Sequence, residues 1–388
     1  RIGRGAASKE RTMATANQSA GTEQGAGESA ARIQRLQAEM ARRGVDDLIV
    51  GPSPDLRFLI GTGGHVSERM SVLIVPREGQ PAYVVPGLEA PLLANLRGLL
   101  AIHPWEETEA PAAKVAQVIG PGAGRTIAVG DRLWSAFLLR LQAALPGAQW
   151  VESGELMRPL RAVKDAAEIA LLREAARRTD EAWDAFRLTS IAGLTERQAL
   201  RRLLDLTYER GLGPNFGGCG SGPNSASPHH EPDDRVIERG DVVVFDWGGT
   251  LEGYNSDVTR TVAVGEPPAD YLRVYETVLA ANRAALAAVR PGAPCEAIDK
   301  AARDVIEDAG YGAYFIHRVG HGLGLDVHEE PYLVAGNTLP LQAGMVFSDE
   351  PGIYLSGRFG VRIEDTVVCT DQGGELLNHA YRELTVMS

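Results

Sequence analysis

The second half of this chain carries charged side chains at the ends of runs that otherwise read as buried strands. Asp246 ends an apolar run that begins at Val242, and Asp257 opens a run that continues to Val264. Burying an unpaired charge is costly, so each of these groups needs a compensating partner. A fold for this chain has to provide those partners at the ends of its strands.

Asp246 and Asp257 lie eleven residues apart (257 − 246), and a hairpin between their strands would bring both carboxylates to one spot. Three further residues sit in similar contexts: His321 in Gly-His-Gly, Glu350 in Asp-Glu-Pro-Gly, and Glu364 in Arg-Ile-Glu-Asp. Each alone is weak evidence, because such residues often form turns or are ordinary core and surface residues. The informative observation is that all five occur together.

The charges of this set favour two metal ions. Its four carboxylates carry four negative charges, which two divalent cations would neutralise and one would not. One imidazole among carboxylate oxygens suits manganese, cobalt or ferrous iron better than a thiolate-rich zinc site would. We therefore expect two divalent ions, manganese first among them.

The length of 388 residues predicts two domains, because single cores usually stop growing below this size. Residues 1–28 are rich in Gly, Ala, Ser, Gln and Glu and lack an apolar stretch, so we expect a disordered tail and no signal peptide. Met13 within it could be the native start. We expect one domain over residues 29–153 and a second over residues 154–388.

The first domain alternates short apolar runs with helical stretches, which predicts an α/β fold. We expect helices near 30–43, 89–97 and 133–145, and strands at 47–51, 71–76, 82–86 and 126–130. In the second domain, 158–188 reads as one long helix or a kinked pair, and Thr195 opens another with a capping box. Strands at 241–247, 257–264, 345–348 and 361–370 surround helices at 271–289 and 296–309, which predicts α+β around a curved, mostly antiparallel sheet.

Composition excludes several functions. The net charge of −12 argues against a nucleic-acid partner, and no apolar run approaches the roughly 20 residues that cross a bilayer. Cys219, Cys295 and Cys369 are widely spaced, which fits neither a disulfide framework nor a zinc knuckle. We expect a cytoplasmic protein without a membrane partner.

In order and context, the five charged residues resemble the ligand set of the prolidase, aminopeptidase P and methionine aminopeptidase superfamily, the "pita-bread" metallopeptidases. The resemblance covers the chain from Arg158 onward, and the preceding region resembles that family's creatinase-type N-terminal domain. It implies a homodimer, with Asp257 and Glu364 bridging two metals, Asp246 binding one, and His321 with Glu350 binding the other. A creatinase-like amidinohydrolase or a non-catalytic binding module of this fold would lack the complete set.

The resemblance also implies roles for other residues. His229, His317 and His328 match histidines that line the substrate pocket, and Arg362 matches an arginine that supports the bridging carboxylate. Their alternative is ordinary loop histidines in contact with water. His230 we interpret as non-catalytic, and Trp247 and Tyr254 as packing residues.

The implied activity is hydrolysis of the bond between a peptide's N-terminal residue and a following proline. A hydroxide shared by the metals attacks the carbonyl, Glu350 also accepts a proton, and His328 with His229 stabilises the oxyanion. Strict dipeptidases of the family hold the substrate carboxylate with an arginine in the loop after the His-Glu pair. Residues 328–344 contain no Arg or Lys, so the sequence favours aminopeptidase P-type cleavage over prolidase activity, unless another cation such as Arg358 serves.

Overall fold

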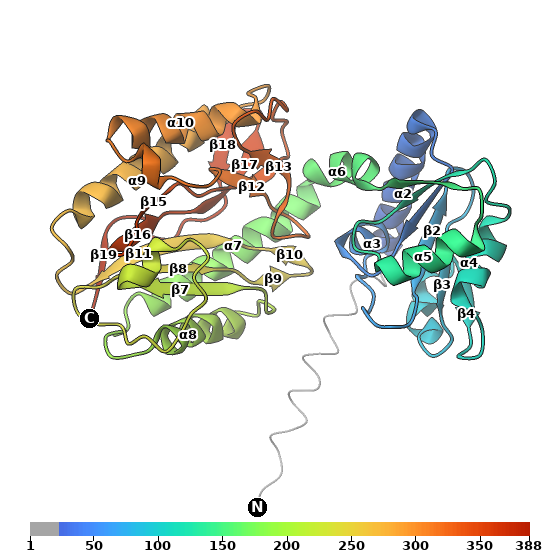
Figure 1. Ribbon diagram of the computed structural model, residues 1–388, viewed down its shortest axis with the longest axis horizontal. Coiled ribbons are helices and arrows are strands. Elements are labelled where there is room, and N and C mark those ends of the chain that lie inside the picture. Colours follow the sequence, from blue (N-terminus) through green and yellow to red (C-terminus); the bar gives the residue numbers. More distant parts are fainter. Residues whose placement is uncertain (1–22) are drawn as a thin grey trace, which may run out of the picture. The chain divides into compact units, whose positions relative to one another are not determined.

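The computed structural model describes residues 23–388, which divide into two compact units, one ending at Arg161 and the other spanning Ala162–Ser388 (Figure 1). The expected domain boundary at residue 153 lies eight residues earlier (161 − 153). The expected disordered tail also extends too far, because its last residues, from Glu23 on, form the start of a helix. The rest of that tail, with Met13, lies outside the described residues.

The first unit contains a six-stranded mixed sheet in the order β4-β3-β2-β1-β5-β6. The strands are β1 (Asp47–Val50), β2 (Val72–Pro76), β3 (Ala82–Pro86), β4 (Ala101–Trp105), β5 (Thr126–Val129) and β6 (Gln149–Glu152). The helices are α2 (Glu23–Arg43), α3 (Pro54–Ile60), the 3₁₀ helix η2 (Ala90–Leu96), α4 (Pro111–Ile119), α5 (Ser135–Ala144) and α6 (Gly154–Ala162). β1 pairs antiparallel with β2 and parallel with β5, so the predicted α/β domain is confirmed.

The second unit begins with two helices that capping boxes open. The predicted stretch 158–188 is a broken pair, α6 and α7 (Ala166–Phe186), because Asp165 adopts an extended conformation and caps α7 with its carboxylate. Thr195 likewise caps α8 (Glu196–Glu209), and Gln198 completes the capping box as predicted. These caps fix where each helix starts.

Two larger sheets follow. One has the order β19-β11-β8-β7 and the other β13-β12-β14-β17-β18, and all neighbours are antiparallel except β11 and β19. Their strands are β7 (Gly217–Ser221), β8 (Val242–Trp247), β11 (Val258–Val264), β12 (Gly320–Gly322), β13 (Glu329–Leu333), β14 (Val346–Asp349), β17 (Asp365–Thr370), β18 (Gly373–Leu376) and β19 (Thr385–Met387). Smaller pairs are β9 (Thr250–Leu251) with β10 (Tyr254–Asn255), and β15 (Gly352–Leu355) with β16 (Phe359–Arg362).

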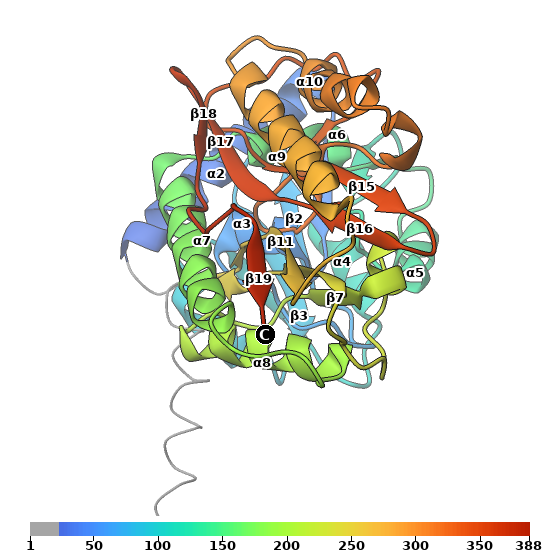
Figure 2. The ribbon, with the colours of Figure 1, turned by 90° about the vertical axis from the view of Figure 1, so that its left-hand side faces the viewer.

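Helices cover both sides of these sheets. α9 (Tyr271–Ala288) and α10 (Cys295–Asp308) lie together on one side, while α7 and α8 lie on the other (Figures 1 and 2). The short 3₁₀ helices η3 (Gly222–Ala226) and η4 (Gly312–Tyr314) lie in connections. The predicted α+β domain with a mostly antiparallel sheet is confirmed. No helix within residues 23–388 combines the length and apolar character that a membrane crossing requires.

Candidate metal centre

The predicted hairpin brings the two aspartates together. β8 and β11 pair antiparallel with Asp246 opposite Thr259, so Asp257, which directly precedes β11, lies beside the same end of β8. Glu364 reaches this point from the break between β16 and β17, where its backbone N–H donates to the carbonyl of Thr259. Three chain segments therefore deliver three carboxylates to one place.

His321 on β12 and Glu350 after β14 complete the group. His321 Nε2 lies 3.2 Å from Glu350 Oε1 and 3.7 Å from Asp257 Oδ2, and the His321 and Asp257 side chains are almost fully buried. Asp257, His321 and Glu364 each offer a ligand atom within 4.8 Å of the other two. Asp257, His321, Glu350 and Glu364 therefore lie together, with Asp246 beside them at the adjoining end of β8.

The carboxylates in this cluster strongly disturb one another. Burial and the neighbouring carboxylates raise the pKa of Asp257 and of Glu364 well above their usual range. Burial also opposes ionisation of Glu350, but the hydrogen bond and positive charge of His321 outweigh it and hold the pKa of Glu350 at about 2. Full ionisation of all four groups therefore requires additional positive charge.

Two buried oxygens in the cluster point to metal ions as the source of that charge. Asp246 Oδ1 and Asp257 Oδ1 are inaccessible to solvent and have no hydrogen-bond partner among residues 23–388. An unsatisfied buried acceptor costs about 1–3 kcal/mol, and more if it is charged. Divalent cations would coordinate these oxygens and neutralise the carboxylates, so the residues fit a dinuclear metal site.

Arg362 donates its shortest hydrogen bond to Asp246, whereas the resemblance implied that it supports a bridging carboxylate. It donates to Asp246 Oδ2 at 2.7 Å, to the Tyr354 hydroxyl at 2.9 Å and to Thr259 Oγ1 at 3.0 Å. Thr259 Oγ1 in turn donates to Glu364 Oε2 at 2.6 Å. Arg362 therefore contacts Asp246 directly and reaches Glu364 only through a threonine that the sequence analysis did not identify.

His317 is held by two hydrogen bonds that set its tautomer. Nδ1 lies 2.7 Å from the Arg318 carbonyl, which only accepts, so Nδ1 carries the proton. Nε2 then accepts from the Tyr354 hydroxyl at 2.8 Å, which is consistent with Arg362 donating to the same hydroxyl. Burial lowers the pKa of His317. Tyr354, also absent from the sequence prediction, links His317 to Arg362.

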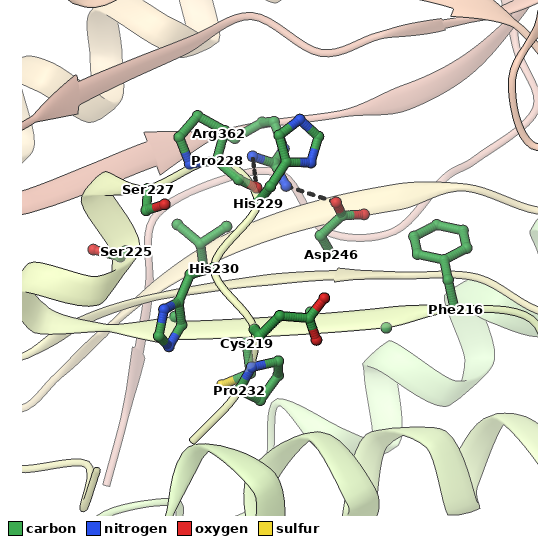
Figure 3. Close-up of a pocket in the computed structure, with 15 residues that line it drawn as sticks. Phe216, Cys219, Ser225, Ser227, Pro228, His229, His230, Pro232, Asp246 and Arg362 are labelled. Atoms are coloured by element: carbon green, nitrogen blue, oxygen red, sulfur yellow. Dashed lines mark hydrogen bonds and ion pairs between the residues drawn. The ribbon is translucent and has the colours of Figure 1, made fainter. Parts of the chain in front are cut away.

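His328 and His229 reach the site from two different segments of the chain. The ring centroids of His328 and His321 are 3.8 Å apart, and burial together with the charge of His321 lowers the pKa of His328 to about 4. His229 lines a pocket of about 210 Å³ that also exposes Asp246 and Arg362 (Figure 3). Both histidines therefore face the carboxylate cluster.

The segment that carries His321 and His328 is anchored at two points. The carbonyl of Gly324 accepts from Asn255 Nδ2 at 2.8 Å. Directly after His328, Glu329 Oε1 lies 2.7 Å from Lys164 Nζ, and these side chains are 9% and 1% exposed. Lys164 lies in the short connection between α6 and α7, and the sequence analysis assigned it no role.

The remaining residues named from sequence occupy ordinary positions. Trp247 is fully buried in an apolar core, and the Tyr254 hydroxyl donates to Glu168 Oε1 at 2.7 Å. His230 turns toward Glu196, at 2.8 Å, instead of toward the carboxylate cluster. All three cysteines are free and buried.

Residues 170–371 match metallopeptidase family M24, and residues 32–163 match the creatinase/prolidase N-terminal domain. The chain is 41% identical over 363 residues to the "Probable dipeptidase PepE" of Mycobacterium tuberculosis, covering 92% of this chain and 96% of that protein. Among solved structures, dipeptidase PepE from Mycobacterium ulcerans is 42% identical with a TM-score of 0.88, covering 93% of this chain and 98% of that one. The prolidase from Thermococcus sibiricus is 37% identical with a TM-score of 0.88, covering 92% and 98%.

Proposed function

Because this chain belongs to metallopeptidase family M24 and carries a creatinase/prolidase N-terminal domain, we propose that it hydrolyses the bond between a peptide's N-terminal residue and a following proline. The observation that carries this proposal is the buried cluster around Asp257, His321 and Glu364, with Asp246 and Glu350 beside it. Most peptidases fail at this bond, because proline lacks an N–H and restricts the residue before it.

The proposed metal ligands are Asp246, Asp257, His321, Glu350 and Glu364, and the proposed metals are two divalent ions, with manganese preferred over cobalt and ferrous iron. When bound, such ions lower the pKa of water and polarise the scissile carbonyl. The oxygen-rich ligand set and the orphaned aspartate oxygens support this assignment.

The chain's own side chains supply the proton transfers. Glu350 lies in the proposed metal site, 3.2 Å from His321, and is placed to accept the proton of the attacking water and pass it to the proline nitrogen as that bond breaks. His328, neutral because its pKa is about 4, retains an N–H for the negative charge that develops on the carbonyl oxygen. We propose that His229 assists His328 in stabilising this negative charge, while His317 and Arg362 hold the surrounding side chains in position.

Dipeptides are the first candidate substrates, because PepE and the Thermococcus prolidase carry dipeptidase names. The sequence favoured longer peptides for lack of an arginine in residues 328–344. However, the Arg318 guanidinium lies 4.3 Å from the Tyr332 ring centroid, so a cation stands beside that loop. Arg358, the other cation considered, is paired with Asp270. Aminopeptidase P-type cleavage therefore becomes the second candidate.

The deciding experiment compares kcat/KM of the manganese-loaded protein for alanyl-proline, alanyl-prolyl-alanine and alanyl-alanine. We expect the proline dipeptide to be cut best and chelation to abolish turnover. Preference for the tripeptide would favour aminopeptidase P-type activity. Absence of turnover on every proline peptide, with metal bound, would refute the proposal and favour a different hydrolase or a binding module of this fold.

A cytoplasmic location, a homodimer and the lack of nucleic-acid and membrane partners remain predictions. The three buried free thiols are compatible with a reducing compartment, and the net charge of −12 disfavours phosphate backbones. Sedimentation analysis of the purified protein tests the dimer.

A further inference from the structure

Glu196, in the first turn of α8, is a fully buried carboxylate with an unusually large set of donors. Its side chain has no solvent exposure and accepts five hydrogen bonds. Oε1 accepts from the backbone N–H and hydroxyl of Ser221, both at 2.7 Å, and from Asn224 Nδ2 at 3.1 Å. Oε2 accepts from His230 Nε2 at 2.8 Å and from the Asp233 N–H at 3.1 Å.

These donors come from the two ends of one segment, residues 221–233, and His229 lies between them. Between these ends, the Gly360 N–H donates to Ser225 Oγ at 2.9 Å, and next to His229 the Arg362 Nη1 donates to the carbonyl of Pro228 at 3.5 Å. Figure 3 shows the His229 ring beside Arg362 and the His230 ring on the other side of the backbone. His230 thus holds the segment on Glu196 while its neighbour faces the site.

Glu196, His230 and Asp233 are also close enough together to suggest a cation site. The hydrogen bonds argue against it, because both oxygens of Glu196 already serve two or more donors. Backbone N–H groups are obligatory donors that compete with a cation for the same lone pairs. The arrangement is that of a structural anchor.

We propose that Glu196 is a positioning residue for the peptidase reaction, acting through His229. It rests on the proposed function, in which His229 contacts the reacting carbonyl. Ser221 is also held by the pairing of β7 with β8, so the contribution specific to Glu196 is to hold the His230–Asp233 end on the start of α8 and thereby to limit where the adjacent His229 imidazole lies relative to Asp246 and Arg362. Displacing a reacting group by about 1 Å can cost about a hundredfold in rate.

The test variant is Glu196→Gln. The amide oxygen can still serve Ser221 and Asn224, but the amide NH₂ then meets the Asp233 N–H donor, so one end of the segment is released. We expect kcat/KM to fall about tenfold or more. Metal content should stay at the wild-type level, because no proposed ligand lies in residues 221–233. Hydrogen exchange of that segment should rise selectively.

A double-mutant cycle separates positioning from general destabilisation. His229→Ala should remove most of what Glu196→Gln affects, so the double variant should be no slower than His229→Ala alone. The matched control is Asp47→Asn, another buried carboxylate, which pairs with Arg125 in the first unit. It should lower stability and leave kcat/KM unchanged. If Glu196→Gln does not fold, His230→Ala releases the same end.

Additive losses in the cycle, loss of metal, or unchanged exchange in residues 221–233 would each overturn the inference. Failure of the proposed function is recognised separately, because the wild-type protein would then lack turnover on proline peptides. The exchange measurement does not depend on activity and reports on the anchor in either case.

Discussion

We predict that Lys164→Met destabilises the protein by about 3–5 kcal/mol, the usual cost of leaving one partner of a buried ion pair alone. Lys164 Nζ lies 2.7 Å from Glu329 Oε1, and the two side chains are 1% and 9% exposed, so water cannot replace the lost cation. Methionine keeps the length and apolar stem of lysine, which confines the change to the charge. The free energy of unfolding is measured by urea denaturation of the metal-free protein.

Two further variants make this test decisive. Lys164→Met combined with Glu329→Gln should be more stable than Lys164→Met alone, because the buried carboxylate that lost its lysine is replaced by a neutral amide. Arg201→Met is the control, since its pair with Asp205 is exposed on both sides and worth at most about 1 kcal/mol. If Lys164→Met lowers the free energy of unfolding by no more than Arg201→Met does, the Lys164–Glu329 pair next to His328 is solvated and our account of this segment is wrong.

The remaining predictions concern the metal centre. The purified protein reloaded with manganese should hold about two ions per chain; a single ion would refute the dinuclear site. Asp257→Asn should lose metal and activity together, whereas His328→Ala should keep its metal and lose about a hundredfold in kcat; metal loss in the latter would make His328 a ligand. Burial and Asp365 raise the pKa of Asp349 well above 3.8, so this group favours folding below that pH and opposes it as the pH rises. In urea titrations of the metal-free protein, Asp349→Asn should therefore raise the free energy of unfolding near neutral pH but not at about pH 4. Equal effects at both pH values would show that the pKa of Asp349 is not raised in the folded protein.

Sequence reasoning succeeded for helices with their own start signals and for continuous apolar strands, and it missed α3 and β4. The capping box at Thr195 marked α8 correctly. α3 has seven residues, too few to show a helical period, although Ser53 caps it and Pro54 occupies its first turn. β4 contains Pro104, which disguises it as a loop, although it pairs with β3. The secondary structure of these segments depends on contacts with parts of the chain that are distant in sequence.

The same contrast holds at the site. The proposed ligands could be found in the sequence because charges at the ends of apolar strands are unusual. The roles of Thr259, Tyr354 and Glu196 could not be found in the sequence. These are ordinary polar residues, and their roles depend on hydrogen-bond partners that are distant in the chain. Thr259 meets Glu364 105 residues later, and Tyr354 meets His317 37 residues earlier. Such contacts exist only after the strands have paired.

The parallel pairing of β19 with β11 has a consequence for synthesis of the protein. β19 includes Thr385 and Val386 near the end of the chain, and it docks on the strand that follows Asp257. Asp246 and Asp257 are therefore synthesised more than a hundred residues before Glu364, and β19 follows later still. Because a metal that binds only the folded protein stabilises only that state, metal binding would protect chains in which β19 has paired with β11 against proteolysis and would not protect chains in which this pairing is absent.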